Sequence, residues 1–209
     1  NSVCGRDCGL SPQEALPIFY PKQKGLCAMK KCLIVVDYQN DFVTGSLGFP
    51  EAVALEDRIV SKIQEYRENG DVVMFTFDTH TKEYLITQEG RNLPVPHCIG
   101  GTEGHQLYGA VGQNVREDDW CFIKYTFGSD ALYEFLTKNP FRSIELVGVV
   151  TNICVIANAV LAKTAQPETP VLVDAACVAS NDPVLHEKAL DVMESLQIQV
   201  SREEMERHE

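Results

Sequence analysis

Apolar residues along this chain gather in short continuous runs, and these runs are separated by segments in which apolar and polar residues recur at helical spacing. A short, fully apolar run rich in β-branched residues is typical of a strand buried on both faces of a parallel sheet. The runs predict six strands, at 32–39, 71–78, 120–125, 143–150, 170–179 and 197–200.

The segments between the strands carry helix patterns and helix-end residues. Leu55, Ile59 and Ile63 share one helical face, and Asn69-Gly70 is typical of a helix C-terminus. Ser129 is suited to cap a second helix, whose apolar face holds Leu132, Phe135 and Leu136. An apolar helix is expected over 151–165.

The last predicted helix begins with Asp182 as N-cap and Pro183 at the first helical position. Its spacing predicts a buried face made of Leu185, Ala189, Val192, Met193 and Leu196. By contrast, the stretch 79–118 is rich in glycine and proline, and we expect it to be a long irregular loop with a functional role.

Alternating strands and helices predict an α/β fold of three layers, with a doubly wound, mostly parallel six-stranded sheet and helices on both faces. Such sheets bind ligands beyond the carboxyl ends of their strands. We expect residues 31–200 to form this domain, with 1–30 as an N-terminal extension and 201–209 as a polar tail.

Composition and charge narrow the classes of partner. The 209 residues are 44% hydrophobic and 23% charged, which is ordinary for a globular protein. Thirty acidic against 18 basic residues give a net charge of −12, which disfavours nucleic acids and anionic membranes as partners. No apolar run approaches the roughly 18–20 residues of a membrane span. We therefore expect a cytoplasmic protein that acts on a small molecule, with its eight cysteines reduced.

Three reactive residues follow predicted strands. Asp37 and Lys124 lie at strand ends, and Cys154 lies in the first turn of the helix after the fourth strand. A helix N-terminus and a nearby ammonium lower the pKa of a thiol, and a carboxylate can accept and return its proton. The set predicts a nucleophile, a thiolate stabiliser and a general acid/base. The alternative for each residue alone is structural: a turn cap, a solvent-facing charge and a core cysteine.

A second group of polar residues begins at the end of the second strand. Asp78 and His80 are two residues apart, so their side chains share one face of an extended segment, and His97 follows in the loop. Mixed carboxylate and imidazole ligands suit zinc, iron or manganese. Candidates for a further ligand are Glu83, Glu89 and His105. His80 as an ordinary hydrogen-bonding loop residue is the alternative.

Five segments in this order resemble the isochorismatase-like cysteine hydrolases: VVDYQNDF at 35–42, DTH at 78–80, PVPHCIGGTEG at 94–104, FIKYTFGS at 122–129 and GVVTNIC at 148–154. The Asp-x-His pair and the His that precedes Cys98 are similar to the nicotinamidase (pyrazinamidase) branch of this superfamily. The resemblance covers about residues 31–200, nearly the whole chain apart from its two ends.

The resemblance implies a catalytic triad of Asp37, Lys124 and Cys154. It also implies a cis peptide at Val149–Val150 and an oxyanion hole made by the N–H groups of Val150 and Cys154. Asp78, His80 and His97 match ligands of one divalent transition metal, zinc before iron or manganese, and Glu89 lies near a fourth carboxylate ligand that some members use. The substrate pocket is implied at Phe42 and Phe127, with Leu93 as a further wall.

One departure concerns the substrate. Nicotinamidases often carry Trp or Phe shortly before the metal-binding His, and here the segment reads Leu93-Pro94-Val95-Pro96. The resemblance implies hydrolysis of nicotinamide to nicotinate and ammonia, in pyridine nucleotide salvage, by a homo-oligomer. The alternatives are a metal-independent hydrolase of another small amide, a carbamoyl compound or a vinyl ether, and a non-catalytic binding module.

Overall fold

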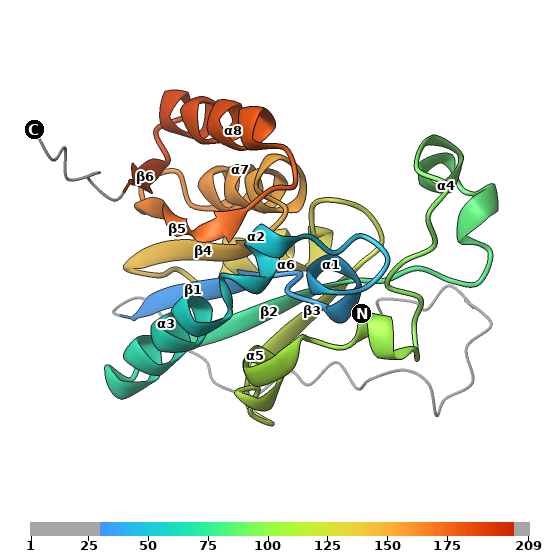
Figure 1. Ribbon diagram of the computed structural model, residues 1–209. Helices are drawn as coiled ribbons and strands as arrows, with labels where there is room; N and C mark the ends of the chain where they lie inside the picture. Colours follow the sequence, from blue (N-terminus) through green and yellow to red (C-terminus); the bar gives the residue numbers. More distant parts are fainter. Residues whose placement is uncertain (1–29, 203–209) are drawn as a thin grey trace, which may run out of the picture.

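A computed structural model describes residues 30–202 and contains one six-stranded sheet (Figure 1). Its strands are β1 (Lys31–Val36), β2 (Val72–Asp78), β3 (Trp120–Lys124), β4 (Ser143–Val149), β5 (Val171–Ala179) and β6 (Gln199–Ser201). Every strand pair is parallel, so the expected strands and the α/β fold class are confirmed. Nearly all of the predicted extension and tail lies outside the described residues, and the domain boundaries stay predictions.

The strand order is β3-β2-β1-β4-β5-β6, so the chain winds outward from β1 in one direction and from β4 in the other. The connections after β1 and after β4 therefore leave the sheet on opposite faces, and in open α/β sheets the ligand crevice lies at the carboxyl ends of two such strands. Asp37 directly follows β1 and Cys154 lies just after β4. The strand order places both residues at this crevice.

Helices cover both faces of the sheet, and alternate residues of β1 pack to opposite sides. Ile34 and Val36 belong to one core cluster, and Leu33 and Val35 belong to the other. The first face is covered by α6 (Asp130–Lys138), α7 (Ile156–Ala165) and α8 (Pro183–Ser195). The second is covered by α1 (Asn40–Val43), α2 (Pro50–Val53), α3 (Glu56–Glu68) and α5 (Gly109–Gln113). The sheet is therefore the middle of three layers.

The predicted helix ends are confirmed by hydrogen bonds and backbone angles. The Ser129 hydroxyl accepts from the Leu132 amide at 3.1 Å, and Asp182 Oδ1 accepts from the amides of Val184 and Leu185 at 2.9 and 3.0 Å. Gly70 follows α3 with a φ of +71°, a left-handed conformation that glycine adopts without steric cost.

The predicted buried face of α8 is partly wrong. Leu185, Val192 and Leu196 are 43, 48 and 44% exposed, and the residues that α8 buries are Ala189, Leu190 and Met193. Apolar residues lie on two adjoining stripes of this helix, and spacing alone does not tell which stripe packs against the sheet.

The region 79–118 is also more ordered than expected, because it contains four short helical segments: η2 (Tyr84–Ile86), α4 (Gln88–Asn92), η3 (Glu103–His105) and α5. Segments of three to five residues are too short to show a helical period in the sequence. Figure 1 shows α4 standing away from the sheet.

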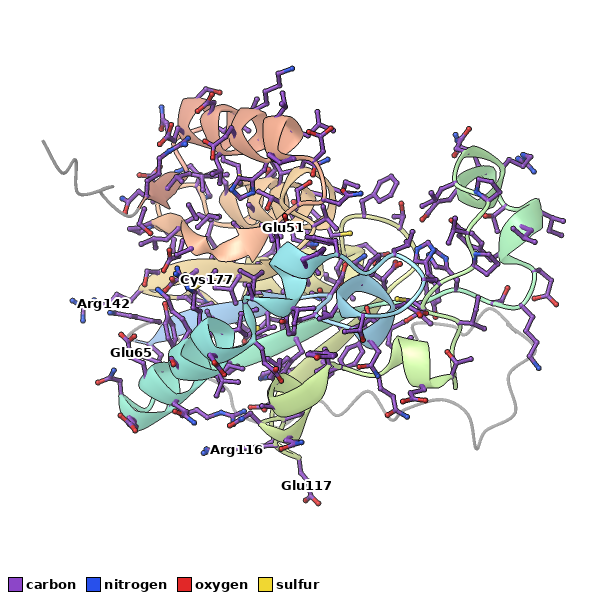
Figure 2. The ribbon with its side chains drawn as sticks, in the orientation of Figure 1. Glu51, Glu65, Arg116, Glu117, Arg142 and Cys177 are labelled. Carbon is purple, nitrogen blue, oxygen red and sulfur yellow. The ribbon has the colours of Figure 1, made fainter. Side chains whose placement is uncertain are left out.

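No helix among the described residues is long and apolar enough to cross a bilayer. Charged side chains such as Arg116, Glu117 and Arg142 project outward from the fold (Figure 2). The five cysteines of the described region are all free thiols, as predicted.

Candidate active site and metal centre

Asp37, Lys124 and Cys154 meet at the carboxyl edge of the sheet. The Lys124 ammonium lies 2.7 Å from Asp37 Oδ2 and 3.6 Å from the Cys154 sulfur. All three side chains are buried, with at most 5% of any residue exposed. The structure thus brings together the three residues that the sequence predicts as a nucleophilic site.

The local backbone presents Cys154 and Asp37 to each other. Cys154 lies in η4 (Thr151–Val155), a single π-helical turn between β4 and α7, where the sequence predicts regular helix. Such turns are frequent at functional sites because they shift a side chain relative to the helix that follows. Asp37 has a φ of +45°, and its Oδ1 accepts a 2.6 Å hydrogen bond from the Thr76 hydroxyl of β2.

Burial decides the direction of the pKa shift at two members of this cluster, Cys154 and Asp37. Desolvation raises the pKa of the Cys154 thiol; the Lys124 ammonium opposes this rise and Asp37 adds to it. Burial also raises the pKa of Asp37, again against the pull of Lys124. The sequence predicts a lowered thiol pKa, and that expectation is wrong for the resting site because it leaves out the desolvation of a fully buried sulfur. A neutral thiol beside a basic carboxylate is well matched for proton transfer.

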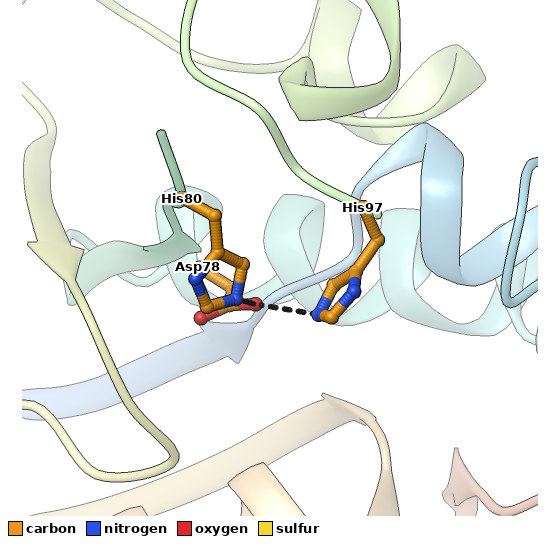
Figure 3. Close-up of side chains that lie close together, drawn as sticks. All are labelled: Asp78, His80 and His97. Atoms are coloured by element: carbon orange, nitrogen blue, oxygen red, sulfur yellow. Dashed lines mark ion pairs between the residues drawn. The ribbon is translucent and has the colours of Figure 1, made fainter. Parts of the chain in front are cut away.

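Asp78, His80 and His97 form a second cluster next to the first. Asp78 Oδ2 lies 3.0 Å from His80 Nε2 and 3.3 Å from His97 Nε2 (Figure 3). The His97 segment is held against the end of β2, because the His80 amide donates to the Cys98 carbonyl and the Gly100 amide donates to the His80 carbonyl. The His97 Nδ1 lies 2.8 Å from the Val95 carbonyl, which turns Nε2 toward Asp78.

These side chains fit a divalent transition metal. One carboxylate oxygen and two imidazole nitrogens lie within 4.8 Å of one another. His80 Nε2 is buried without a hydrogen-bond partner among the described residues, although Asp78 is near, because their geometry does not suit a hydrogen bond. A buried polar atom without a partner is costly, and a metal ion would satisfy it.

Lys124 joins the two clusters. Its ammonium lies 3.2 Å from Asp78 Oδ1, whereas the two histidines contact the other oxygen of that carboxylate, Oδ2. The strand register produces this contact, because Asp78 of β2 is paired with Lys124 of β3. Burial alone would raise the pKa of Asp78, but the two histidines and Lys124 outweigh it and hold that pKa well below its usual value.

Comparison with known proteins agrees with this geometry. The family model described as the isochorismatase domain matches residues 31–204. The chain belongs to the isochorismatase family. A solved nicotinamidase/pyrazinamidase, PncA from Bacillus subtilis, is 35% identical, with 83% of this chain and all of that chain covered at a TM-score of 0.73.

Two further proteins are similar to this member of the isochorismatase family. The pyrazinamidase of Pyrococcus horikoshii, solved in complex with zinc, is 27% identical, with 83% of this chain and 99% of that chain covered at a TM-score of 0.73. The nicotinamidase of Saccharomyces cerevisiae is 26% identical, with 81% of this chain and 98% of that protein covered.

Of the candidates for a further metal ligand, the structure brings in only Glu89. Its Oε1 lies 3.6 Å from His80 Nε2 and 3.7 Å from His97 Nε2. Glu83 is exposed, and its amide donates to the Thr81 hydroxyl. His105 is buried elsewhere, with its Nε2 2.7 Å from the Thr79 hydroxyl.

The backbone before Cys154 has the form that the family resemblance implies. The peptide bond between Val149 and Val150 is cis. The amides of Ile153 and Val155 both donate to the Val150 carbonyl, at 3.0 and 3.1 Å, and these bonds close the turn that carries Cys154. The amides of Val150 and Cys154, predicted as an oxyanion hole, therefore belong to one tight turn.

The predicted substrate-pocket residues Phe42, Leu93 and Phe127 differ in burial. The Phe42 ring packs at 5.4 Å from the His97 ring and is nearly buried. Leu93 is 38% exposed, and Phe127, just beyond β3, is 46% exposed. An aromatic ring does lie near the histidines, since the Tyr84 ring centroid is 4.6 Å from that of His80, but Tyr84 is only 1% exposed.

Sequence reasoning missed two buried amides that hold the site. The Gln39 side chain donates to the Asp78 carbonyl at 2.9 Å and accepts from the Asp78 amide at 2.8 Å, which fixes the end of β2 against the segment after β1. Asn158 of α7 donates to the Cys154 carbonyl at 2.8 Å. Gln39 lies within the motif VVDYQNDF and Asn158 within an apolar segment, but neither pattern by itself names a hydrogen-bond partner.

Proposed function

We propose that this chain is a cysteine-dependent, metal-assisted amidohydrolase that converts nicotinamide and water to nicotinate and ammonia. The observation that carries the proposal is the position of the Lys124 ammonium, in contact with the Asp37 and Cys154 side chains on one side and with Asp78 of the metal cluster on the other. Relatives named nicotinamidase and pyrazinamidase support the amide as substrate class.

In the first half of the reaction, the Cys154 sulfur attacks the amide carbon while its proton passes to Asp37. The amides of Val150 and Cys154 donate to the oxygen that becomes negative. Asp37 then gives the proton to the departing nitrogen, the C–N bond breaks and ammonia leaves. The product of this half is a thioester between Cys154 and the acyl group.

In the second half, water attacks the thioester carbon and Asp37 accepts a proton from that water. The C–S bond breaks, and the sulfur recovers a proton as the carboxylic acid is released. Lys124 holds Asp37 in place and stabilises negative charge on sulfur when the thiol proton has moved. The raised pKa of Asp37 suits both of its roles.

Asp78, His80 and His97, with Glu89 as a fourth ligand, would hold one divalent transition metal, with zinc preferred to iron or manganese. When bound, the ion supplies a Lewis acid to which a pyridine nitrogen can bind. Phe42, Leu93 and Phe127 would flank the flat ring of the substrate. Binding by ring nitrogen would orient the carboxamide toward the thiol, which is a positioning effect.

The test is ammonia release from nicotinamide, from benzamide and from a small carbamoyl compound, with metal-loaded and with chelated protein. Benzamide has the same shape as nicotinamide and lacks the ring nitrogen. We expect nicotinamide to be hydrolysed by loaded protein, and benzamide to be a much poorer substrate. Equal rates on nicotinamide and benzamide, unchanged by chelation, would favour the metal-independent hydrolases instead.

A binding module without catalysis predicts no ammonia release from any amide and a Cys154 thiol that iodoacetamide leaves unmodified. The cytoplasmic location, the homo-oligomeric state and the absence of nucleic-acid and membrane partners stay predictions.

A further inference from the structure

Asn158 is a completely buried polar residue in the first turn of α7. Its Nδ2 donates to the Cys154 carbonyl at 2.8 Å and to the Phe127 carbonyl at 3.1 Å. Its Oδ1 accepts from the Ser129 amide at 3.0 Å. Both the NH₂ group and the oxygen of the side-chain amide are therefore hydrogen-bonded, which fixes the orientation of the Asn158 side chain.

The partners of Asn158 belong to two different pieces of the active site. Cys154 is in the π-helical turn η4, while Phe127 and Ser129 are in the segment that follows Lys124. The same segment contacts the Lys124 side chain directly, because the Lys124 ammonium donates to the Thr126 carbonyl at 3.0 Å. Asn158 thus links the turn that carries the thiol to the segment that contacts the Lys124 ammonium.

We propose that Asn158 is a positioning residue that sets the separation of 3.6 Å between the Lys124 ammonium and the Cys154 sulfur. The inference rests on the proposed function, in which Cys154 is the nucleophile. The hydrogen bonds of the Asn158 side chain go to backbone groups and not to the sulfur or the ammonium. Asn158 therefore acts through the backbone of the two segments. Misplacement by about 1 Å of a reacting group can lower a rate by about 100-fold, so a link of this kind has a measurable effect.

A general contribution to stability is the competing explanation, and the same helix supplies a matched control. Gln166 lies just after α7, at its far end, and is also a buried amide. It donates to the carbonyls of Leu136 and Asn139, both at 2.9 Å, and accepts from the Phe141 amide at 3.0 Å. Loss of Gln166 therefore breaks a comparable set of bonds far from Cys154.

The experiment measures the rate at which iodoacetamide alkylates Cys154 at one fixed pH, with mass spectrometry of the Cys154 peptide. The variants are Asn158→Ala, Asn158→Thr and Gln166→Ala, each compared with the wild type for melting temperature and for kcat and KM. A threonine hydroxyl can donate to the carbonyl four residues earlier, here Cys154, but it is too short to hold the loop. Asn158→Thr therefore keeps the bond within the helix and loses the link.

We expect both Asn158 variants to alkylate about 10- to 100-fold more slowly than the wild type, with the loss of activity mainly in kcat. Gln166→Ala is expected to lower the melting temperature to a similar extent and to alkylate at the wild-type rate. If Asn158→Ala does not fold, Asn158→Thr and Gln166→Ala decide the question.

Two results would overturn the proposal: alkylation of Asn158→Thr at the wild-type rate, or equal slowing by Gln166→Ala. The alkylation measurement does not depend on any amide substrate. A wild type that is alkylated at Cys154 but releases no ammonia would therefore contradict the proposed function while leaving this inference to be decided by the variants.

Discussion

At the scale of single residues, the groups around the Cys154 sulfur have opposite effects on the pKa of its thiol. Burial and the Asp37 carboxylate raise the pKa of the thiol, and the Lys124 ammonium lowers it. Asp37→Asn removes the negative charge and keeps the shape. We expect the thiol pKa to fall, so that more thiolate is present near neutral pH and iodoacetamide reacts faster, while ammonia release is lost because no base remains.

The measurement for Asp37→Asn is the alkylation rate of Cys154 as a function of pH, beside ammonia release from nicotinamide. Cys154→Ala is the control and should show neither alkylation at this position nor turnover, with an unchanged fold. Slower alkylation of Asp37→Asn than of wild type would mean that Asp37 does not act on the thiol as proposed.

Glu83 is a matched control for the role of Glu89 in metal binding, since both residues lie in the connection between β2 and β3. Glu89 Oε1 faces both histidines, whereas Glu83 is exposed. We expect Glu89→Gln to weaken binding of zinc by about 10- to 100-fold, and Glu83→Gln to leave it unchanged. Competition with a chromophoric chelator gives both affinities, and equal affinities would remove Glu89 from the ligand set.

At the scale of elements, a partly buried ion-pair network ties α3 to β4 and β5. The Lys62 ammonium lies 2.6 Å from Glu145 Oε1 and 2.9 Å from Asp174 Oδ2, and Lys62 is only 23% exposed at its side chain. Lys62→Met would leave two carboxylates without their cation. We expect a loss of about 2–4 kcal/mol in the free energy of unfolding at pH 7, measured by urea denaturation.

At acid pH, we expect a smaller difference in the free energy of unfolding between the wild type and Lys62→Met. Burial opposes ionisation of Asp174, but Lys62 outweighs it and lowers the pKa of that carboxyl. The stabilisation is therefore present above the ordinary carboxyl pKa of about 4 and is lost as the pH falls through the lower folded-state value. The exposed pair of Lys138 and Glu134 is the control, and Lys138→Met should cost less than about 0.5 kcal/mol. Equal losses in the two variants would contradict the network's role.

At the scale of the whole molecule, we expect the fold to be independent of metal binding at Asp78, His80 and His97. Two core clusters cover the two faces of the sheet, and the candidate ligands Asp78, His80 and His97 lie at its edge. We expect chelated protein to keep its circular dichroism spectrum and its Cys154 alkylation, while KM for nicotinamide rises strongly. Unfolding on chelation, or an unchanged KM, would contradict a metal that positions substrate.

The sequence by itself determined the sheet, several ends of the longer helices and which reactive residues lie at strand ends. These features are local: apolar runs, caps such as Ser129 and Asp182, and the position of Asp37, Lys124 and Cys154 relative to strands. Local patterns act over a few residues, so they can be read without knowing the neighbours in space.

Tertiary structure decided what depends on contacts between distant segments. The sequence gives no means of pairing Asp78 with Lys124 or of finding the partners of Asn158, because each contact follows from strand order, register or loop path. The buried face of α8 and the raised pKa of Cys154 belong to the same class. Packing and desolvation are properties of the folded surroundings, and the residues that provide them are far apart along the chain.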